Sequence, residues 1–283
     1  MSAHTKLAGV TGWPLTQSLS PGIHGAWLRE HRIDGVYVPL PIRREDFSRA
    51  LQGLRQSGFV GVNVTIPHKE AAFALAHVLD DDARACGAVN LLLFRDDAIE
   101  GRNTDAFGLH ASITAELGAD IVRGKRAILL GAGGAARAAV LALARLGASD
   151  IHILNRHKSR AETMAAQLTP HVRAKLTAAD FSGWPQVAGD TALLVNATSA
   201  GMTGNPPLDL PLDGLPAQAA VCDIVYKPLE TDLVKRARAR GLRAINGLGM
   251  LMHQAVPSFA AFYGVTPTVT PELRATLEVQ VAA

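Results

Sequence analysis

Cysteine is scarce in this chain of 283 residues, which contains only Cys86 and Cys222. The two lie far apart and form no ligand pair, so the sequence predicts neither a disulfide framework nor a zinc site. The 10 histidines also show no metal-ligand spacing, and we expect no bound metal. A reducing cytoplasm is therefore the expected location.

Long hydrophobic runs and an excess of charge of one sign are also missing. No stretch approaches the ~18 uninterrupted apolar residues of a membrane span, and the N-terminus lacks the apolar segment of a signal peptide. Lys and Arg number 28 against 25 Asp and Glu, and the small basic cluster at 235–240 is typical of a solvated helix end. We expect neither a membrane nor a nucleic acid as partner.

The remaining composition, 48% hydrophobic and 19% charged residues, is that of a globular enzyme with full cores, and the length suggests two domains. Apolar runs alternate with helical patterns, which predicts two α/β domains. From Arg126 onward there are six such apolar runs, which is the number of strands in a full doubly wound, Rossmann-type parallel sheet. They lie at 126–130, 151–155, 172–176, 192–196, 220–225 and 242–246.

The first half of the chain shows a second alternation of the same kind. Its expected strands lie near 6–11, 35–40, 60–65 and 88–94, and its expected helices near 21–32, 43–57 and 68–79. In the second half, the helix expected at 134–146 is followed by Gly147, which is typical of a helix C-terminus. The pattern alone does not place the tail that follows residue 246.

Residues 126–136 form a short apolar run, a glycine-rich turn and the start of an alanine-rich helix. These are the first strand, turn and helix of a dinucleotide-binding fold, in which Gly131 permits the tight turn and Gly133 lets a pyrophosphate approach the backbone. The glycines alone are a weak signal, but the flanking strand and helix give the required context. Because the motif begins so far into the chain, a sizeable domain precedes it.

The segment after the second strand of this module, Asn155 to Arg160, contains no acidic residue. An NAD site usually has an Asp or Glu here for the ribose 2′-hydroxyl, whereas a 2′-phosphate requires cations. Arg156 and Arg160 therefore favour NADP. The alternative is that both arginines simply begin a solvated helix.

The segment Asn63 to Lys69 is a candidate catalytic segment at the end of a strand. Side chains alternate along a strand, so Asn63 and Thr65 should point to one side, with Lys69 close by. Pro67 suits the first turn of the helix that follows. Alternatively, Thr65 caps that helix and Lys69 lies on the surface.

A second polar segment, Asn103-Thr104-Asp105, lies near the expected domain crossover and would otherwise be a helix cap. When a ketone receives a hydride, the developing alkoxide must be stabilised and protonated. A lysine held by a carboxylate can do both, so Lys69 and Asp105 are a candidate catalytic pair.

Two hydroxyls, Ser18 and Ser20, lie just before a helix near the N-terminus. Ser20 followed by Pro21 is typical of an N-cap and first helical position, whereas Ser18 has no such structural explanation. Two hydroxyls beside a helix N-terminus are a reasonable site for a carboxylate.

Taken in order, these motifs resemble those of the shikimate dehydrogenase family over essentially the whole chain. The lysine segment and the segment Gly247–Gln254 are specific, whereas the glycine loop is shared with many dehydrogenases. Further matching segments are Ser18–Pro21, Gly87–Asn90, Asn103–Asp105, Gly131–Arg137, Asn155–Arg156, Asn196–Met202 and Tyr226–Pro228.

The resemblance implies reversible, NADP-dependent reduction of 3-dehydroshikimate to shikimate in aromatic amino-acid biosynthesis. It implies a substrate-binding domain of residues 1–105 with 247–283, on which the tail packs, and an NADP-binding Rossmann domain of residues 106–246. The small-molecule substrate is the expected partner of a monomer or homodimer.

The resemblance also implies roles for individual residues, with Lys69 and Asp105 serving proton transfer. The implied substrate ligands are Ser18 and Ser20 for the carboxylate, together with Asn63, Thr65, Lys69, Asn90, Asp105, Tyr226 and Gln254. The implied cofactor ligands are Gly131, Ala132, Gly133, Gly134, Ala135, Asn155, Arg156, Arg160, Thr198, Ile224 and Gly247.

Several residues depart from the common pattern of that family, namely Gln17, Gly25, Ala106 and His157. None removes a group assigned to chemistry, but Ala106 and His157 leave room for altered substrate or cofactor tolerance. The alternatives are a quinate/shikimate dehydrogenase or paralogue with broader substrate or NAD use, and a regulator that binds the ligand without turnover. Arg156 weighs against the first, and the presence of Lys69 and Asp105 weighs against the second.

Overall fold

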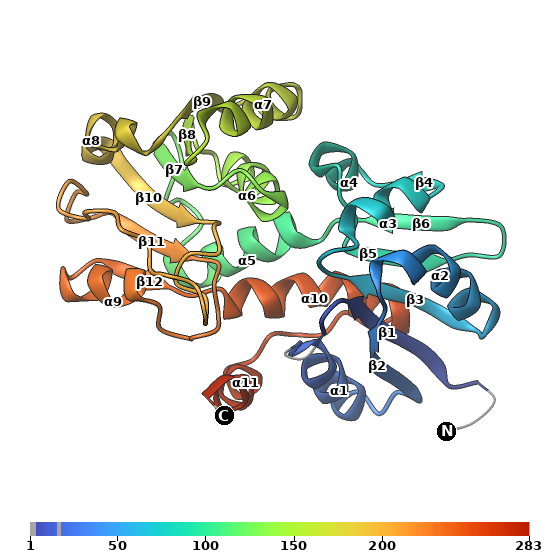
Figure 1. The fold of residues 1–283 in the computed structure, drawn as a ribbon. Helices are drawn as coiled ribbons and strands as arrows, with labels where there is room; N and C mark the ends of the chain where they lie inside the picture. Colours follow the sequence, from blue (N-terminus) through green and yellow to red (C-terminus); the bar gives the residue numbers. More distant parts are fainter. Residues whose placement is uncertain (1–3, 16–17, 283) are drawn as a thin grey trace. The chain divides into compact units, whose positions relative to one another are not determined.

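The computed structural model describes residues 4–15 and 18–282, which form two compact units (Figure 1). The first unit extends to Thr104 and resumes at Met252–Gln280, and the second comprises Asp105–Leu251 and the residues from Val281. Asp105 falls in the second unit, one residue before the expected boundary, because it begins helix α5 (Asp105–Leu117), which packs on α6 (Gly134–Arg145). Residues 247–251, which were expected in the substrate-binding domain, also belong to the second unit. There, Gly247 lies against Ile224.

The first unit is built on a six-stranded sheet of order β2-β1-β3-β5-β6-β4. Only β5 runs against its neighbours, so the sheet is mixed and its first three strands are parallel. The strands are β1 (Lys6–Gly12), β2 (Gly35–Pro41), β3 (Phe59–Val64), β4 (Val78–Leu79), β5 (Leu91–Phe94) and β6 (Ile99–Arg102).

Both faces of this sheet are covered. On one face, Phe47 and Leu51 of α2 pack with Val62 and Leu92 of the sheet in an apolar core. On the other, aromatic side chains of α1 and α10, among them Trp27 and Phe259, contact one another. The helices of this unit are α1 (Ser20–Glu30), α2 (Phe47–Gln56), α3 (Lys69–Leu75), α4 (Asp81–Cys86), α10 (Leu248–Tyr263), which begins in the second unit, and α11 (Pro271–Ala282).

The second unit has a fully parallel six-stranded sheet of order β12-β11-β10-β7-β8-β9. The strand order reverses between β7 and β10, and in such sheets ligands bind at the carboxyl ends of the strands at this point. The strands are β7 (Arg126–Leu130), β8 (Asp150–Leu154), β9 (Lys175–Ala179), β10 (Thr191–Asn196), β11 (Ala220–Asp223) and β12 (Arg243–Ile245).

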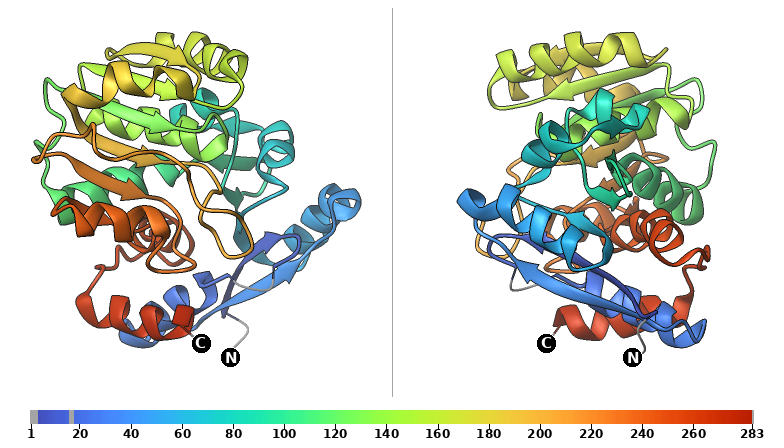
Figure 2. Two further views of the ribbon diagram at one scale, coloured as in Figure 1. Left: turned by 60° about the vertical axis from the view of Figure 1, so that its left-hand side comes forward. Right: turned by 90° about the vertical axis from the view of Figure 1, so that its right-hand side faces the viewer.

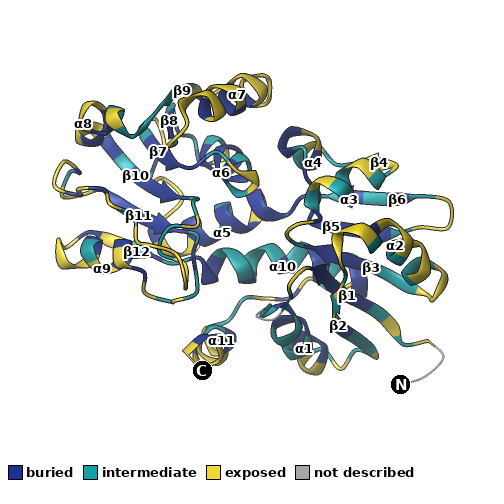
Figure 3. Cartoon of the chain, viewed as in Figure 1, coloured by how far each residue is buried: buried dark blue, intermediate teal, exposed yellow. Residues whose placement is uncertain are grey.

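Helices cover both faces of the second sheet (Figures 1 and 2). Because parallel crossovers are right-handed, the reversal places α6 and α7 on one face and α9 on the other. The strands between them are mostly buried, and exposed residues lie on the outer helix surfaces and on the loops (Figure 3). The remaining helices of this unit are α7 (Lys158–Leu168), α8 (Trp184–Val187) and α9 (Asp232–Ala239). Its 3-10 turns cover Thr169–His171, Phe181–Gly183 and Ala188–Asp190, and the first unit has one at Arg44–Asp46.

Most expected elements are present, and the differences have local causes. The strand expected at 172–176 is wrong by three residues, since β9 occupies Lys175–Ala179 and a turn fills its expected start. Two short strands, β4 and β6, and helix α4 were not expected. The end of the helix expected near 68–79 is wrong, because α3 stops at Leu75 and β4 occupies Val78–Leu79. α4 is a single short helix, capped by the Asp80 carboxylate and closed by left-handed Gly87, so it offers too few residues for a periodic pattern. Within the described residues, no helix is long and apolar enough to cross a membrane.

Candidate active site

A cluster of amide side chains lies in the first unit, where segments distant in sequence meet. Asn90, 3% exposed, donates from Nδ2 to Thr104 Oγ1 at 3.0 Å and to Gln254 Oε1 at 3.4 Å. Its Oδ1 accepts from the Thr104 amide at 2.8 Å. Thr104 Oγ1 lies 3.3 Å from Gln254 Oε1, so the hydroxyl bridges the two amides. Two predicted substrate ligands, Asn90 and Gln254, are therefore in direct contact.

Asn63 joins the same cluster from the end of β3. Its Nδ2 donates to the Asn90 carbonyl at 3.1 Å and to Ser258 Oγ at 2.8 Å. Its Oδ1 accepts from the Tyr37 hydroxyl at 2.8 Å. Neither Tyr37 nor Ser258 was predicted from the sequence, because strand and helix periodicity place both as ordinary core positions.

Lys69 is the first residue of α3, and its backbone is hydrogen-bonded to the segment that carries Asn90. Its carbonyl accepts from the Val89 amide at 3.0 Å, immediately before Asn90. Pro67 precedes the helix, so the prediction that it occupies the first helical turn is wrong. The N-cap is His68, whose Nε2 lies 2.7 Å from the Ile42 carbonyl and whose ring stacks on Phe47. This buried anchor, which the sequence did not reveal, fixes the start of α3.

Thr65 does not cap α3, because the N-cap of that helix is His68 and no side chain bonds its first amides. The Thr65 amide donates to the Thr11 carbonyl at 2.9 Å, which extends the pairing of β1 and β3 by one residue. Thr65 is two positions after Asn63, with one residue between them, so both lie at the same end of β3. The alternative assignment of Thr65 as a cap is therefore wrong.

The two N-terminal serines occupy the start of α1. The helix begins at Ser20, its N-cap residue is Leu19, and no side chain hydrogen-bonds its first amides. The prediction that Ser20 is the N-cap is therefore wrong. Ser18 Oγ accepts weakly from the Ser20 amide at 3.4 Å. Ser20 is 7% exposed. Gln17 lies outside the described residues.

Asp105 is the first residue of α5 and is 7% exposed. A carboxylate in the first turn of a helix is stabilised by the helix dipole. The residue belongs to the second unit and Lys69 to the first. Their catalytic pairing therefore stays a prediction.

The glycine loop of the second unit connects β7 to α6 at the switch point. Gly131 has φ +106°, and a Cβ there would lie 3.0 Å from the Ala197 carbonyl oxygen, so only glycine fits without strain. Gly133 is the N-cap of α6 and has no side-chain cap, and a Cβ on Gly133 or Gly134 would meet open space. The first helical amides therefore remain accessible to an anion. This arrangement fits the pyrophosphate of a dinucleotide.

Arg156 and Arg160 are exposed at the start of α7, and neither forms an ion pair among the described residues. The neighbouring Lys158 differs, since its ammonium lies 3.4 Å from the Glu162 carboxylate. Arg160 lines a cavity of about 250 Å³ that the glycine-loop residue Ala132 also lines. Within one unit, Arg160 thus lies near the phosphate-binding loop.

Asp223, at the end of β11, organises the loops at the carboxyl edge of the second sheet. Its Oδ1 accepts from Asn196 Nδ2 at 2.9 Å and from the Val225 amide at 3.1 Å, and its Oδ2 accepts from Thr231 Oγ1 at 2.6 Å. Asn196 Oδ1 in turn accepts from Thr198 Oγ1 at 2.7 Å. Burial raises the pKa of the Asp223 carboxyl above its ordinary value. The predicted cofactor residue Thr198 is thereby tied to a residue that the sequence analysis did not single out.

Gly247 and Ile224, two further predicted cofactor residues, lie in close backbone contact. A Cβ on Gly247 would be 1.9 Å from the Ile224 carbonyl oxygen, and the Gly247 amide donates to the Val225 carbonyl at 3.0 Å. Tyr226 follows directly in sequence, and burial raises the pKa of its hydroxyl. The phenol therefore remains protonated at neutral pH.

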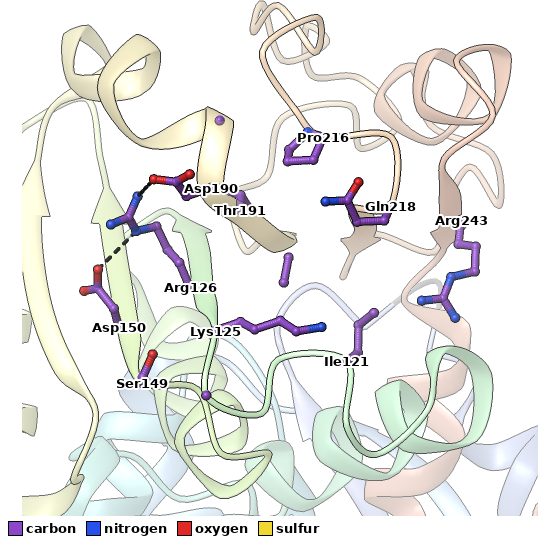
Figure 4. A pocket seen from close by; sticks show the side chains of 13 residues that line it. Ile121, Lys125, Arg126, Ser149, Asp150, Asp190, Thr191, Pro216, Gln218 and Arg243 are labelled. Atoms are coloured by element: carbon purple, nitrogen blue, oxygen red, sulfur yellow. Dashed lines mark hydrogen bonds and ion pairs between the residues drawn. The ribbon is translucent and has the colours of Figure 1, made fainter.

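A cavity of about 670 Å³ lies at the opposite, amino edge of the second sheet (Figure 4). Its lining includes Arg126, which pairs with Asp150 at 3.1 Å and Asp190 at 3.3 Å. Among the described residues, none of the predicted site residues lines it. Because ligands of open α/β sheets bind at the carboxyl ends of the strands, this cavity is not the candidate dinucleotide site. The described residues also contain no group of three or more His, Cys, Asp or Glu side chains suited to a metal ion.

Comparison with known proteins assigns both units to one family. Residues 10–92 match the family described as "Shikimate dehydrogenase substrate binding domain", and residues 114–202 match "Shikimate / quinate 5-dehydrogenase". A protein named shikimate dehydrogenase (NADP(+)) from Methylobacterium radiotolerans is 53% identical over 277 residues, which are 97% of each chain.

Solved structures give the same assignment. Shikimate 5-dehydrogenase from Thermus thermophilus, in complex with NADP(H) and shikimate, is similar at a TM-score of 0.84 and 32% identity, covering 98% of this chain and 99% of the other. Quinate dehydrogenase from Corynebacterium glutamicum, in complex with NAD, is similar at a TM-score of 0.88 and 30% identity, covering 96% and 98%. With relatives of this identity and coverage, the chain belongs to the shikimate dehydrogenase family.

Proposed function

We propose that this protein is an NADP-dependent shikimate dehydrogenase that interconverts 3-dehydroshikimate and shikimate in the shikimate pathway. The observation that carries the proposal is the amide cluster of the first unit. It brings Asn63, Asn90 and Gln254 together from three distant segments, close to Lys69. Such a cluster offers both donors and acceptors, as a polyhydroxylated ring requires. Family membership supports the same assignment.

In this proposal the first unit binds the substrate. Ser18 and Ser20 hold the carboxylate with their hydroxyls at the start of α1, where the helix dipole favours negative charge. Asn63, Thr65, Asn90 and Gln254 bind the ring hydroxyls. Direct contacts among the amides hold their orientation before a ligand arrives.

The second unit is proposed to bind NADP. The pyrophosphate lies against Gly131, Ala132, Gly133, Gly134 and Ala135, while Asn155, Arg156 and Arg160 hold the 2′-phosphate. Arg156 and Arg160 are exposed, and among the described residues they have no carboxylate partner. Both charges therefore remain available to a phosphate. Thr198, Ile224, Tyr226 and Gly247 border the nicotinamide and the substrate.

The proton step is assigned to Lys69 and Asp105. Bound NADPH supplies a hydride to the carbonyl carbon in the direction of reduction. The Lys69 ammonium stabilises the developing alkoxide and donates its proton to that oxygen, which gives the hydroxyl of the product. The Asp105 carboxylate favours the charged lysine, and in the reverse direction the neutral amine accepts the proton.

A cytoplasmic location and a monomeric or homodimeric state are also proposed. Cys86 and Cys222 are both buried and form no disulfide, which suits a reducing compartment. Sedimentation of the purified protein at several concentrations distinguishes a monomer from a dimer.

The decisive experiment is a side-by-side assay of shikimate and quinate, each with NADP and with NAD. We expect shikimate with NADP to generate NADPH absorbance at the highest kcat/KM. Absence of turnover from a folded protein that binds NADP would overturn the enzyme assignment. Preference for quinate with NAD would instead favour the activity named for the Corynebacterium structure.

A further inference from the structure

We propose that Tyr37 is a positioning residue for substrate binding, which acts by fixing the side-chain amide of Asn63. This inference rests on the proposed function, because it takes Asn63 as a ligand of the substrate ring. Nothing in the sequence motifs points to Tyr37, which lies on the edge strand β2. Its side chain is nevertheless only 8% exposed.

Small neighbours let the Tyr37 ring lie across the sheet. Tyr37 pairs with Ala8 on β1, and Ala8 pairs with Gly61 on β3. Paired residues of parallel strands project to the same face, so the ring extends over an alanine and a glycine toward β3. Asn63 is two residues beyond Gly61 on that same face. The phenol thereby reaches across an intervening strand to the predicted substrate residue.

The hydrogen bonds determine which way the Asn63 amide points. The Tyr37 hydroxyl donates to Asn63 Oδ1 at 2.8 Å. Both protons of Nδ2 are used within the protein, one by the Asn90 carbonyl and one by Ser258 Oγ. An amide oxygen has two lone pairs, and one of them accepts from Tyr37. Asn63 can therefore present an acceptor to a substrate hydroxyl, and it has no remaining proton to donate.

The Tyr37 ring is held in place by its surroundings. His24 stacks on it with ring centroids 3.8 Å apart and an angle of 9°, and Phe262 packs nearby at 6.3 Å. Full burial lowers the pKa of His24 to about 3, so the stacked imidazole is neutral. Burial also raises the pKa of Tyr37 well above its ordinary value, and the phenol keeps its proton at any working pH. Tyr37 is thus a fixed donor.

The test is Tyr37→Phe, which keeps the ring and its stacking but removes the donor. Without it, Asn63 Oδ1 loses its one fixed donor, and the amide is held only by the two bonds that Nδ2 donates. We expect the KM and the calorimetric Kd for shikimate to rise about two- to tenfold, the effect of one neutral hydrogen bond. The KM for NADP should stay unchanged. An unchanged shikimate KM, or an equal rise in both KM values, would overturn the proposal.

Tyr263→Phe is the matched control. Tyr263 is also a buried tyrosine of the first unit, and its hydroxyl donates to the Val36 carbonyl at 3.0 Å. This control loses a comparable hydrogen bond and should lower the Tm similarly, yet leave the shikimate KM unchanged. A rise in KM equal to that of Tyr37→Phe would show that general loosening of the unit is responsible, which also contradicts the proposal.

A double-mutant cycle with Asn63→Ala tests the route of the effect. If Tyr37 acts through Asn63, then Tyr37→Phe should not raise the shikimate Kd further in the Asn63→Ala background. Independent effects that multiply would overturn the proposal. If the wild-type protein turns over shikimate and Tyr37→Phe changes nothing, only this inference is refuted. If the folded wild-type protein neither binds nor turns over shikimate, the proposed function is refuted as well.

Discussion

The side-chain amides of Asn90 and Gln254 lie 3.4 Å apart, although 164 positions separate them in the chain. Asn90 immediately precedes β5, and Gln254 lies on α10, in the part of that helix that belongs to the first unit. The return of the chain after the second unit is therefore what completes the amide cluster. A protein ending before α10 would lack both Gln254 and Ser258.

The first prediction concerns Gln254. Gln254→Ala removes a proposed ring-hydroxyl ligand together with two long hydrogen bonds, so the KM for shikimate should rise about three- to tenfold with little change in the KM for NADP. Steady-state kinetics with each substrate varied in turn gives both constants. Gln52→Ala, an exposed position on α2, serves as the control and should change neither. Equal shifts of both constants would argue against a substrate contact.

The second prediction separates catalysis from binding at Lys69. If Lys69 stabilises and protonates the alkoxide, Lys69→Ala should lower kcat by about 10² to 10⁴ and weaken shikimate binding far less. Stopped-flow or steady-state turnover gives kcat, and calorimetry gives the Kd. Lys125→Ala, at an exposed position of the second unit, is the control. An unchanged kcat with a raised KM would make Lys69 a binding residue.

The third prediction concerns cofactor choice. Arg156→Ala and Arg160→Ala should each lower the kcat/KM preference for NADP over NAD by about one to two decades, because each removes a charge-assisted contact of roughly 1.5–3 kcal/mol. The affinity for NAD should change little. Arg173→Ala, an exposed arginine just before the amino end of β9, is the matched control. If NAD and NADP weaken in parallel, the arginines do not contact the 2′-phosphate.

The fourth prediction concerns stability at Asp223. Asp223→Asn replaces one accepting oxygen with a donor, which leaves the Thr231 hydroxyl without its acceptor. The variant should unfold about 1–3 kcal/mol more easily. Denaturant unfolding near neutral pH measures the loss. Asp232→Asn, an exposed aspartate paired with Arg236, is the control and should cost less than about 1 kcal/mol.

The pH dependence at Asp223 follows from the direction of its pKa shift. Burial raises the folded-state pKa above the unfolded value of about 3.9. The cost of ionising the buried group is absent below the unfolded pKa and grows as pH rises through the folded pKa. The stability deficit of Asp223→Asn should therefore shrink as pH increases from about 4. A deficit that widens over this range would show that the folded-state pKa is lowered instead.

Periodicity and turn residues allowed the second unit to be predicted closely, because its strands are apolar and its helices are long. The start of α6 at Gly134 and the left-handed Gly147 after its end both follow from the sequence. The first unit was harder to predict. β4 is two residues long, and β6 contains Glu100 and Arg102, so neither has the apolar pattern on which such predictions depend.

The hydrogen-bonding partners of the site residues could not be predicted in the same way. Asn63 and Asn90 were found as motif residues, but Tyr37 and Ser258 depend on strand pairing and on the return of α10, which are tertiary facts. Thr104 belongs to the polar segment before Asp105, but its sequence position alone predicts no contact. Its bridging position becomes visible once the ends of β5 and β6 are paired.

The hydrogen-bonded ring around Asp223 has a consequence for the thermodynamics of ligand capture. Asn196, Thr198, Val225 and Thr231 are joined to it directly or through one neighbour, so the two loops that follow β10 and β11 are already held together. In the proposed function a nucleotide binds beside these loops, and little of its interaction energy would then be consumed in ordering them. The affinity of the second unit for its ligand is thus set partly by a residue that need not touch the ligand.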